Sequence, residues 1–126
     1  MSLRSPLGTA KGLGSAKEGL HHWWTQRVTA IALIPLTVWF AFKVAVLSQS
    51  DYQTVLECIG SPWSAALIVS LIVAAFYHAA LGMQVIFEDY IGHKAVRVGA
   101  IMATNLLLFL LGAAAIIAVI RIALGG

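Results

Sequence analysis

The sequence predicts an all-α integral membrane protein with three transmembrane helices. Hydrophobic residues make up 60% of the 126 residues and charged residues only 10%, and the mean hydropathy is +0.91. A soluble domain averages about 45–50% apolar and about 25% charged residues. The composition therefore leaves too little polar surface for a water-soluble core, and it excludes soluble enzymes and disordered linkers. Although the net charge is +3, the basic residues are scattered, so we expect no nucleic acid as a partner.

Three long apolar runs predict the three helices. They extend from about residue 28 to 47, from 63 to 87 and from 98 to 124. Each run reaches the roughly 20 residues needed to cross about 30 Å of hydrocarbon at about 1.5 Å per residue. A backbone inside a bilayer must satisfy its own hydrogen bonds, so runs of this length form helices. Pro35 predicts a kink in the first helix, and Pro62 suits the first turn of the second.

Residues 1–27 form a polar, basic arm, expected to lie in the cytoplasm and at the interface, ahead of a three-helix membrane domain at 28–126. The arm contains no long apolar run, so we expect no secretory signal peptide, and we favour a cytoplasmic arm over a mitochondrial transit peptide. Four of the eight basic residues lie in the arm and two in the connector 88–97, whereas the connector 48–62 has none. The positive-inside rule therefore places the N-terminus in the cytoplasm and the C-terminus outside.

His78 is the costliest polar residue to place in this membrane, because it lies near the middle of the second helix. One interpretation is a neutral imidazole that hydrogen-bonds a neighbouring helix. The other is an axial ligand of haem iron. Gly82, one turn further on, leaves room for a flat macrocycle or for another helix, and Asp89 returns to within about 20° of the same helix face. The other three histidines are interfacial, so a bis-histidine haem would need its second ligand from another chain.

Two further clusters lie at the predicted cytoplasmic interface, about 16 Å from His78 along the helix axis. Asp89 and Tyr90 are either a charged helix end with an interfacial tyrosine, or a carboxylate and a phenol placed for a quinone head group. The segment 21–27 combines two histidines, two tryptophans and Arg27. It is either an aromatic anchor with a positive flank or a site for haem propionates, since a guanidinium binds carboxylate bidentately.

The sequence carries no motif for redox chemistry of its own. It contains no glycine-rich dinucleotide or phosphate loop and no cysteine-rich iron–sulfur motif. Its one cysteine, Cys58, excludes an internal disulfide. Any substrate oxidation would therefore take place on partner proteins, and the chain alone is not a catalyst.

Two segments resemble the family of hydrophobic membrane-anchor subunits of succinate dehydrogenase (respiratory complex II), most closely those of the alphaproteobacterial type. From His78 to Tyr90 the chain reads HAALGMQVIFEDY, with a histidine, a glycine four residues later, and Asp-Tyr eleven and twelve residues later. Residues 21–33 read HHWWTQRVTAIAL and are similar to the family's entry into its first helix. The resemblance covers most of the chain and includes the number of spans.

The resemblance implies that the chain is half of a heterodimeric helical anchor in the bacterial cytoplasmic (inner) membrane. It implies that His78 is an axial ligand of haem b, with the other histidine supplied by a second membrane-anchor protein, the cytochrome b subunit. Arg27 and His21 would contact the haem propionate region, and Tyr90 with Asp89 would bind ubiquinone. A flavoprotein subunit and an iron–sulfur subunit would complete an assembly that links the tricarboxylic acid cycle to electron transport.

Three functions remain open from the sequence. The first is the anchor of a succinate:quinone oxidoreductase, and the second is the anchor of a fumarate reductase working in the opposite direction. The third is a small helical scaffold or transporter subunit without a redox centre. A transporter would favour repeated or interrupted helices, whereas only Pro35 interrupts a span here. The role of His22, which stands where some members of the family have an acidic residue, also stays open.

Overall fold

The computed structural model describes residues 6–10 and 17–125, and within them the secondary structure is helical. The helices are α1 (Pro6–Ala10), α2 (Lys17–Leu47), α3 (Tyr52–Gly60), α4 (Pro62–Tyr90) and α5 (Lys94–Ala123). The segment Gly19–Leu47 of α2, the whole of α4 and the whole of α5 are long and apolar enough to cross a membrane. The prediction of an all-α membrane protein with three spans is confirmed.

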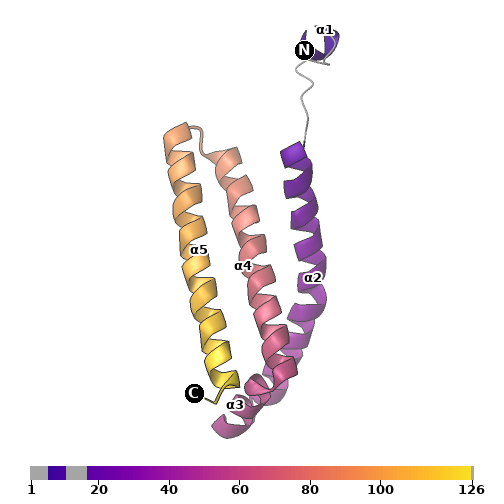
Figure 1. Ribbon diagram of the computed structural model, residues 1–126, viewed down its shortest axis with the longest axis vertical. Helices are drawn as coiled ribbons and strands as arrows, with labels where there is room; N and C mark the ends of the chain where they lie inside the picture. Colours follow the sequence, from indigo (N-terminus) through magenta and orange to yellow (C-terminus); the bar gives the residue numbers. More distant parts are fainter. Residues whose placement is uncertain (1–5, 11–16, 126) are drawn as a thin grey trace.

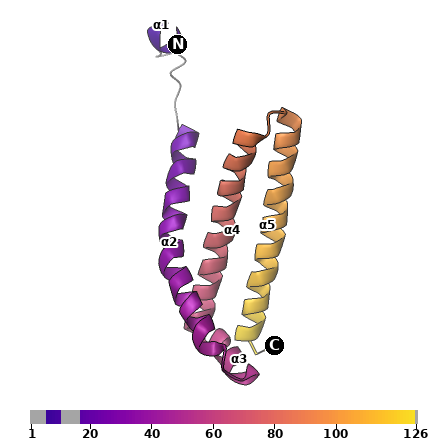
Figure 2. The same cartoon turned by 180° about the vertical axis from the view of Figure 1, so that it is seen from behind.

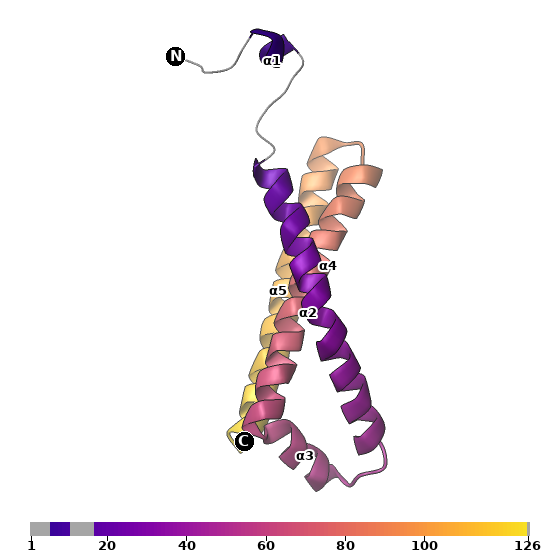
Figure 3. The ribbon, with the colours of Figure 1, turned by 90° about the vertical axis from the view of Figure 1, so that its right-hand side faces the viewer.

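Helix α4 lies in the middle of the bundle, packed against α2 on one side and α5 on the other (Figure 1). The start of α2, the end of α4 and the start of α5 lie at one end of the bundle, which we call the arm end. The short helix α3 lies at the opposite end, beside the C-terminal end of α5. Figure 3 shows that α2 crosses the α4–α5 pair obliquely and diverges from it towards α3.

The long helices extend further than the apolar runs predicted. Helix α2 begins at Lys17, whereas the first span was expected to begin near residue 28, so residues 17–27 continue the same helix. Hydropathy detects only the part of a helix that matches the hydrocarbon thickness, and polar residues extend a helix beyond it without an apolar signal. At about 1.5 Å per residue, the 29 residues of α4 are longer than the hydrocarbon layer is thick. The polar residues of α2 are thereby held on a rigid helix.

Pro35 lies inside α2 without ending it. The helix continues through the proline and is curved rather than straight (Figure 2). A proline ring removes one backbone hydrogen bond and clashes with the preceding turn, which is a recognised cause of helix bending.

Helix α3 was not predicted, because the segment 48–62 was expected to be a connector. Asp51 caps this helix, with Oδ1 accepting a hydrogen bond from the Thr54 hydroxyl at 2.6 Å and Oδ2 from the Thr54 backbone N–H at 3.4 Å. These bonds to Thr54 lower the pKa of the Asp51 carboxyl below its usual value. The apolar residues Val55 and Ile59 are half-buried, four residues apart on one face. A cap followed by apolar residues at helical spacing was the signal that could have identified α3.

Few side chains of the described residues are buried within the chain itself. Leu81 and Val119 are the buried apolar residues, and large side chains on the outside include Phe109, which is 72% exposed. At the contact between α4 and α5, Gly112 lies beside Phe76, and a Cβ built there would lie 3.4 Å from the ring, an ordinary contact. Such a thin core is expected where lipid or partner helices cover the outer surfaces, since association in a membrane depends on close packing and not on exclusion of water.

Candidate functional site

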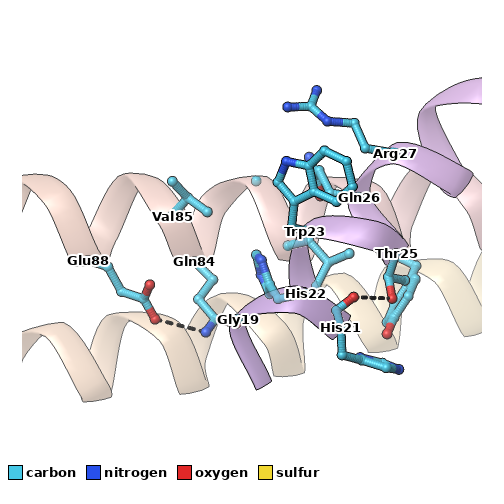
Figure 4. A pocket seen from close by; sticks show the side chains of 13 residues that line it. Gly19, His21, His22, Trp23, Thr25, Gln26, Arg27, Gln84, Val85 and Glu88 are labelled. Carbon is cyan, nitrogen blue, oxygen red and sulfur yellow. Dashed lines mark hydrogen bonds between the residues drawn. The ribbon is translucent and has the colours of Figure 1, made fainter. Parts of the chain in front are cut away.

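A groove of about 1040 Å³ lies between α2 and α4 at the arm end of the bundle. Figure 4 shows the side chains that line it, with the first turns of α2 facing the last turns of α4. Its polar lining includes His21, His22, Gln26, Arg27, Gln84 and Glu88. Residues 21–27 and 82–88 therefore meet in space, although more than fifty residues separate them in the sequence.

His78 lies between α2 and α4, half-buried, with both ring nitrogens in contact with α2. The Nδ1 atom is 2.9 Å from Oγ1 of Thr29, and the Nε2 atom is 3.3 Å from the side-chain nitrogen of Gln26. Gln26 and Thr29 are three residues apart, so they share one face of α2. The histidine is thus held in a defined orientation by two polar side chains on the neighbouring helix.

The sequence did not identify Gln26 and Thr29 as partners of His78. The predicted boundary at residue 28 placed Gln26 in the arm and Thr29 in the first span. Their spacing of three residues was the available signal. Two polar residues on one helix face, at the start of an apolar run, indicate a polar contact within the bundle.

Arg27 and His21 both line this groove. The Arg27 guanidinium carbon is 5.4 Å from the centre of the Trp23 ring. Both Arg27 and His21 are exposed. A guanidinium that remains exposed at the mouth of a groove is suited to binding a carboxylate from outside the chain.

His22, whose role stayed open, also lines the groove. Its Nε2 atom and the Oε1 atom of Gln26 are buried without a hydrogen-bond partner among the described residues. Buried polar atoms are normally paired with protein or water. These two atoms therefore fit a site that gains a further hydrogen-bonding molecule.

Asp89 and Tyr90 lie outside the groove, at the exposed end of α4. Tyr90 is 85% exposed, and α4 ends at this residue. It is Glu88 that lines the groove, where it accepts a hydrogen bond of 2.8 Å from Gln84 (Figure 4). The predicted quinone contacts of Asp89 and Tyr90 thus involve a surface that this chain leaves open to a partner.

The residues around His78 fit one axial ligand of a haem. An imidazole nitrogen is a suitable ligand of haem iron, and Nε2 becomes available to the iron once the Gln26 amide turns away from it. A Cβ built on Gly82 would lie 3.7 Å from that amide, an ordinary contact, so packing within this chain does not itself require a glycine there. Within residues 6–10 and 17–125, no three side chains of the His, Cys, Asp and Glu types gather as a metal site.

Comparison with known proteins identifies the family of the chain. Residues 1–119 match the family described as "Succinate dehydrogenase/Fumarate reductase transmembrane subunit". The chain is 36% identical over 116 residues to a succinate dehydrogenase hydrophobic membrane anchor subunit of Rickettsia bellii, covering 92% of this chain and 93% of that protein. It is 31% identical over 121 residues to the protein of that name in Paracoccus denitrificans, covering 96% and 93% of the two chains. A succinate dehydrogenase membrane anchor subunit of Reclinomonas americana is 34% identical over 88 residues, covering 68% of this chain and 73% of that protein.

Proposed function

The chain belongs to the family of succinate dehydrogenase and fumarate reductase transmembrane subunits, and from this premise we propose that it is the membrane anchor of a succinate:quinone oxidoreductase. It tethers a flavoprotein subunit and an iron–sulfur subunit to the bacterial inner membrane. The observation that carries the proposal is the placement of His78, held between two spanning helices next to a polar groove at the arm end. Relatives named as succinate dehydrogenase anchors support it.

A second membrane-anchor protein, the cytochrome b subunit, completes the membrane domain. Asn105 supports this partner, because it lies exposed eleven residues into α5, beside an apolar groove between α4 and α5. An amide exposed to hydrocarbon costs free energy unless it finds a hydrogen-bond partner. A neighbouring protein can supply that partner and cover the thin core described above.

Haem b is shared between the two anchor proteins in this proposal. His78 holds the iron from this chain, and Arg27 with His21 binds the propionate region at the mouth of the groove. When bound, haem b supplies a one-electron redox centre inside the membrane. This chain's own part is to orient the imidazole through Gln26 and Thr29 and to present a cation to the propionates.

Ubiquinone binds at the exposed end of α4. The Tyr90 hydroxyl donates a hydrogen bond to a quinone carbonyl, and the neighbouring carboxylate of Asp89 orients it or relays protons. Both residues stand at the arm end, where the predicted orientation places the cytoplasm. An iron–sulfur subunit docked on this side reaches the quinone without crossing the membrane.

The other two functions are less well supported. The family description includes fumarate reductase, so family membership alone does not fix the direction of the reaction. The relatives named above are succinate dehydrogenase anchors, which favours succinate oxidation. The same comparisons favour an anchor over a transporter subunit.

The proposal is tested by purifying the chain with an affinity tag from membranes of its own host. We expect three further subunits to copurify, together with a low-spin haem b spectrum and succinate-driven reduction of quinone. Purification of the chain alone, or with partners that neither contain flavin nor oxidise succinate, would contradict the anchor function.

The orientation predicts a simple reporter result. Because four basic residues precede the first span and the connector 48–62 has none, Gly126 should lie outside the cytoplasm. An alkaline phosphatase fused after Gly126 should be active, and a fluorescent reporter that folds only in the cytoplasm should be dark there. The reverse pair of results would overturn the orientation and with it the cytoplasmic placement of the quinone site.

A further inference from the structure

We infer that Thr29 is a positioning residue that fixes the tautomer of His78 and thereby selects Nε2 as the nitrogen available to haem iron. That haem iron binds at His78 rests on the proposed function. The tautomer is a property of the chain alone and can be measured without haem.

The single proton of the Thr29 hydroxyl is committed to the backbone of α2. Its Oγ1 atom lies 2.9 Å from the backbone oxygen of Thr25 and 3.1 Å from that of Gln26. Threonines inside helices commonly donate to a carbonyl in the preceding turn. A hydroxyl has one proton and two lone pairs, so once this proton is donated to the backbone, the oxygen can only accept. The contact of 2.9 Å with His78 is then a hydrogen bond donated by Nδ1–H.

Gln26 faces the other ring nitrogen, but its amide can turn over, so it adapts to the tautomer that Thr29 sets. Its side-chain nitrogen, which has two protons and accepts nothing, lies 3.3 Å from Nε2 of His78. With the amide in this orientation, the Nε2 atom carries the lone pair. Both contacts, as the structure orients them, agree with one tautomer, which has the proton on Nδ1.

The reversed orientation of the Gln26 amide defines the competing arrangement. It would place the amide oxygen against Nε2 and require a proton there. The Thr29 hydroxyl would then have to donate to Nδ1 and give up its bond to the backbone. The two arrangements differ in which ring nitrogen is protonated, so an experiment can separate them.

The tautomer has a direct consequence for metal binding. A haem iron needs the imidazole lone pair, and the hydrogen bond from the opposite nitrogen orients the ring and raises its basicity as a ligand. Thr29 accepts that bond on a neighbouring helix. Gln26 covers the lone pair with a neutral side chain that can rotate away, whereas Thr29 stays fixed by its bond to the backbone.

The first test measures the tautomer in the full chain, in detergent and without haem. The ¹⁵N shifts of the four histidines are recorded, and those of His78 are identified by their loss in His78→Gln. We expect a protonated Nδ1 in the native chain, a proton shared between the two nitrogens in Thr29→Val, and the native pattern again in Thr29→Ser. A proton on Nε2 in the native chain, or no change in Thr29→Val, would overturn the inference.

The second test uses the assembled complex and measures the midpoint potential of haem b. Thr29→Val should shift the ferric–ferrous equilibrium three- to tenfold towards the ferrous form, because a less basic imidazole stabilises ferric iron less well. This equals a rise of roughly 28–59 mV at about 59 mV per tenfold change for one electron. Thr29→Ser should restore the native potential. If His78 is a haem ligand and Thr29→Val leaves the midpoint potential unchanged, the inference is wrong. If the tautomer is confirmed but replacing His78 does not change the haem of the complex, the proposed function is wrong instead.

Discussion

Replacing His78 with tyrosine is expected to remove or strongly alter the low-spin haem b spectrum of the assembled complex. Low-spin haem requires two strong axial ligands, and a phenolate does not reproduce the ligand field of an imidazole. The contacts with Gln26 and Thr29 are also lost, since both converge on the ring nitrogens. The measurements are the reduced-minus-oxidised visible spectrum and the haem content per complex. Because several subunits hold the assembly together, we do not expect the complex to fall apart.

His93→Gln is the matched control for this experiment. His93 is exposed and precedes α5 at the arm end, outside the groove between α2 and α4. Its replacement should leave the spectrum and the haem content unchanged. An unaltered low-spin spectrum with full haem content in His78→Tyr would mean that the histidine is a structural hydrogen-bonding residue and that haem is ligated elsewhere.

The bundle itself could be predicted from the sequence because hydropathy and length are sufficient for it. Three apolar runs of membrane-spanning length have only one way to satisfy their backbones, which is to form helices. The runs do not define where the helices end, because residues 17–27 contain no long apolar run and are still part of helix α2. They also do not reveal α3, which is too short to cross the membrane and depends on the Asp51 cap and on packing against α4 and α5.

The site could be predicted residue by residue but not as a set of contacts. His78 was identifiable because an ionisable group in the middle of a span is costly, and Arg27 because it borders one. The partners of His78 were not, since Gln26 and Thr29 become its neighbours only through the packing of α2 on α4. Contacts between helices depend on their relative rotation, and a single sequence does not specify it.

Tyr90→Phe is expected to lower quinone-linked turnover by roughly threefold to a hundredfold. The substitution removes one hydroxyl and leaves the ring, so packing changes little. Loss of a hydrogen bond to a neutral acceptor costs about 0.5–1.5 kcal/mol, and more where the bond strengthens as charge develops on the quinone oxygen. About 1.4 kcal/mol corresponds to a tenfold change in rate, which gives the stated range. The measurement is succinate-driven reduction of ubiquinone.

Two comparisons separate a quinone contact from general damage. Succinate oxidation with an artificial acceptor that takes electrons upstream of quinone should stay near normal in Tyr90→Phe, because the soluble subunits are untouched. Tyr52→Phe is the matched control, since Tyr52 is 75% exposed and lies in α3 at the opposite end of the bundle. The Tyr52→Phe substitution should leave both activities unchanged.

Two outcomes in Tyr90→Phe would contradict the quinone contact. Equal loss of both activities would indicate failed assembly. Full quinone turnover with intact binding of quinone-site inhibitors would mean that Tyr90 is only an interfacial anchor. Because Tyr90 is exposed in this chain alone, a loss confined to quinone reduction would also mean that a neighbouring protein of the complex closes the site around it.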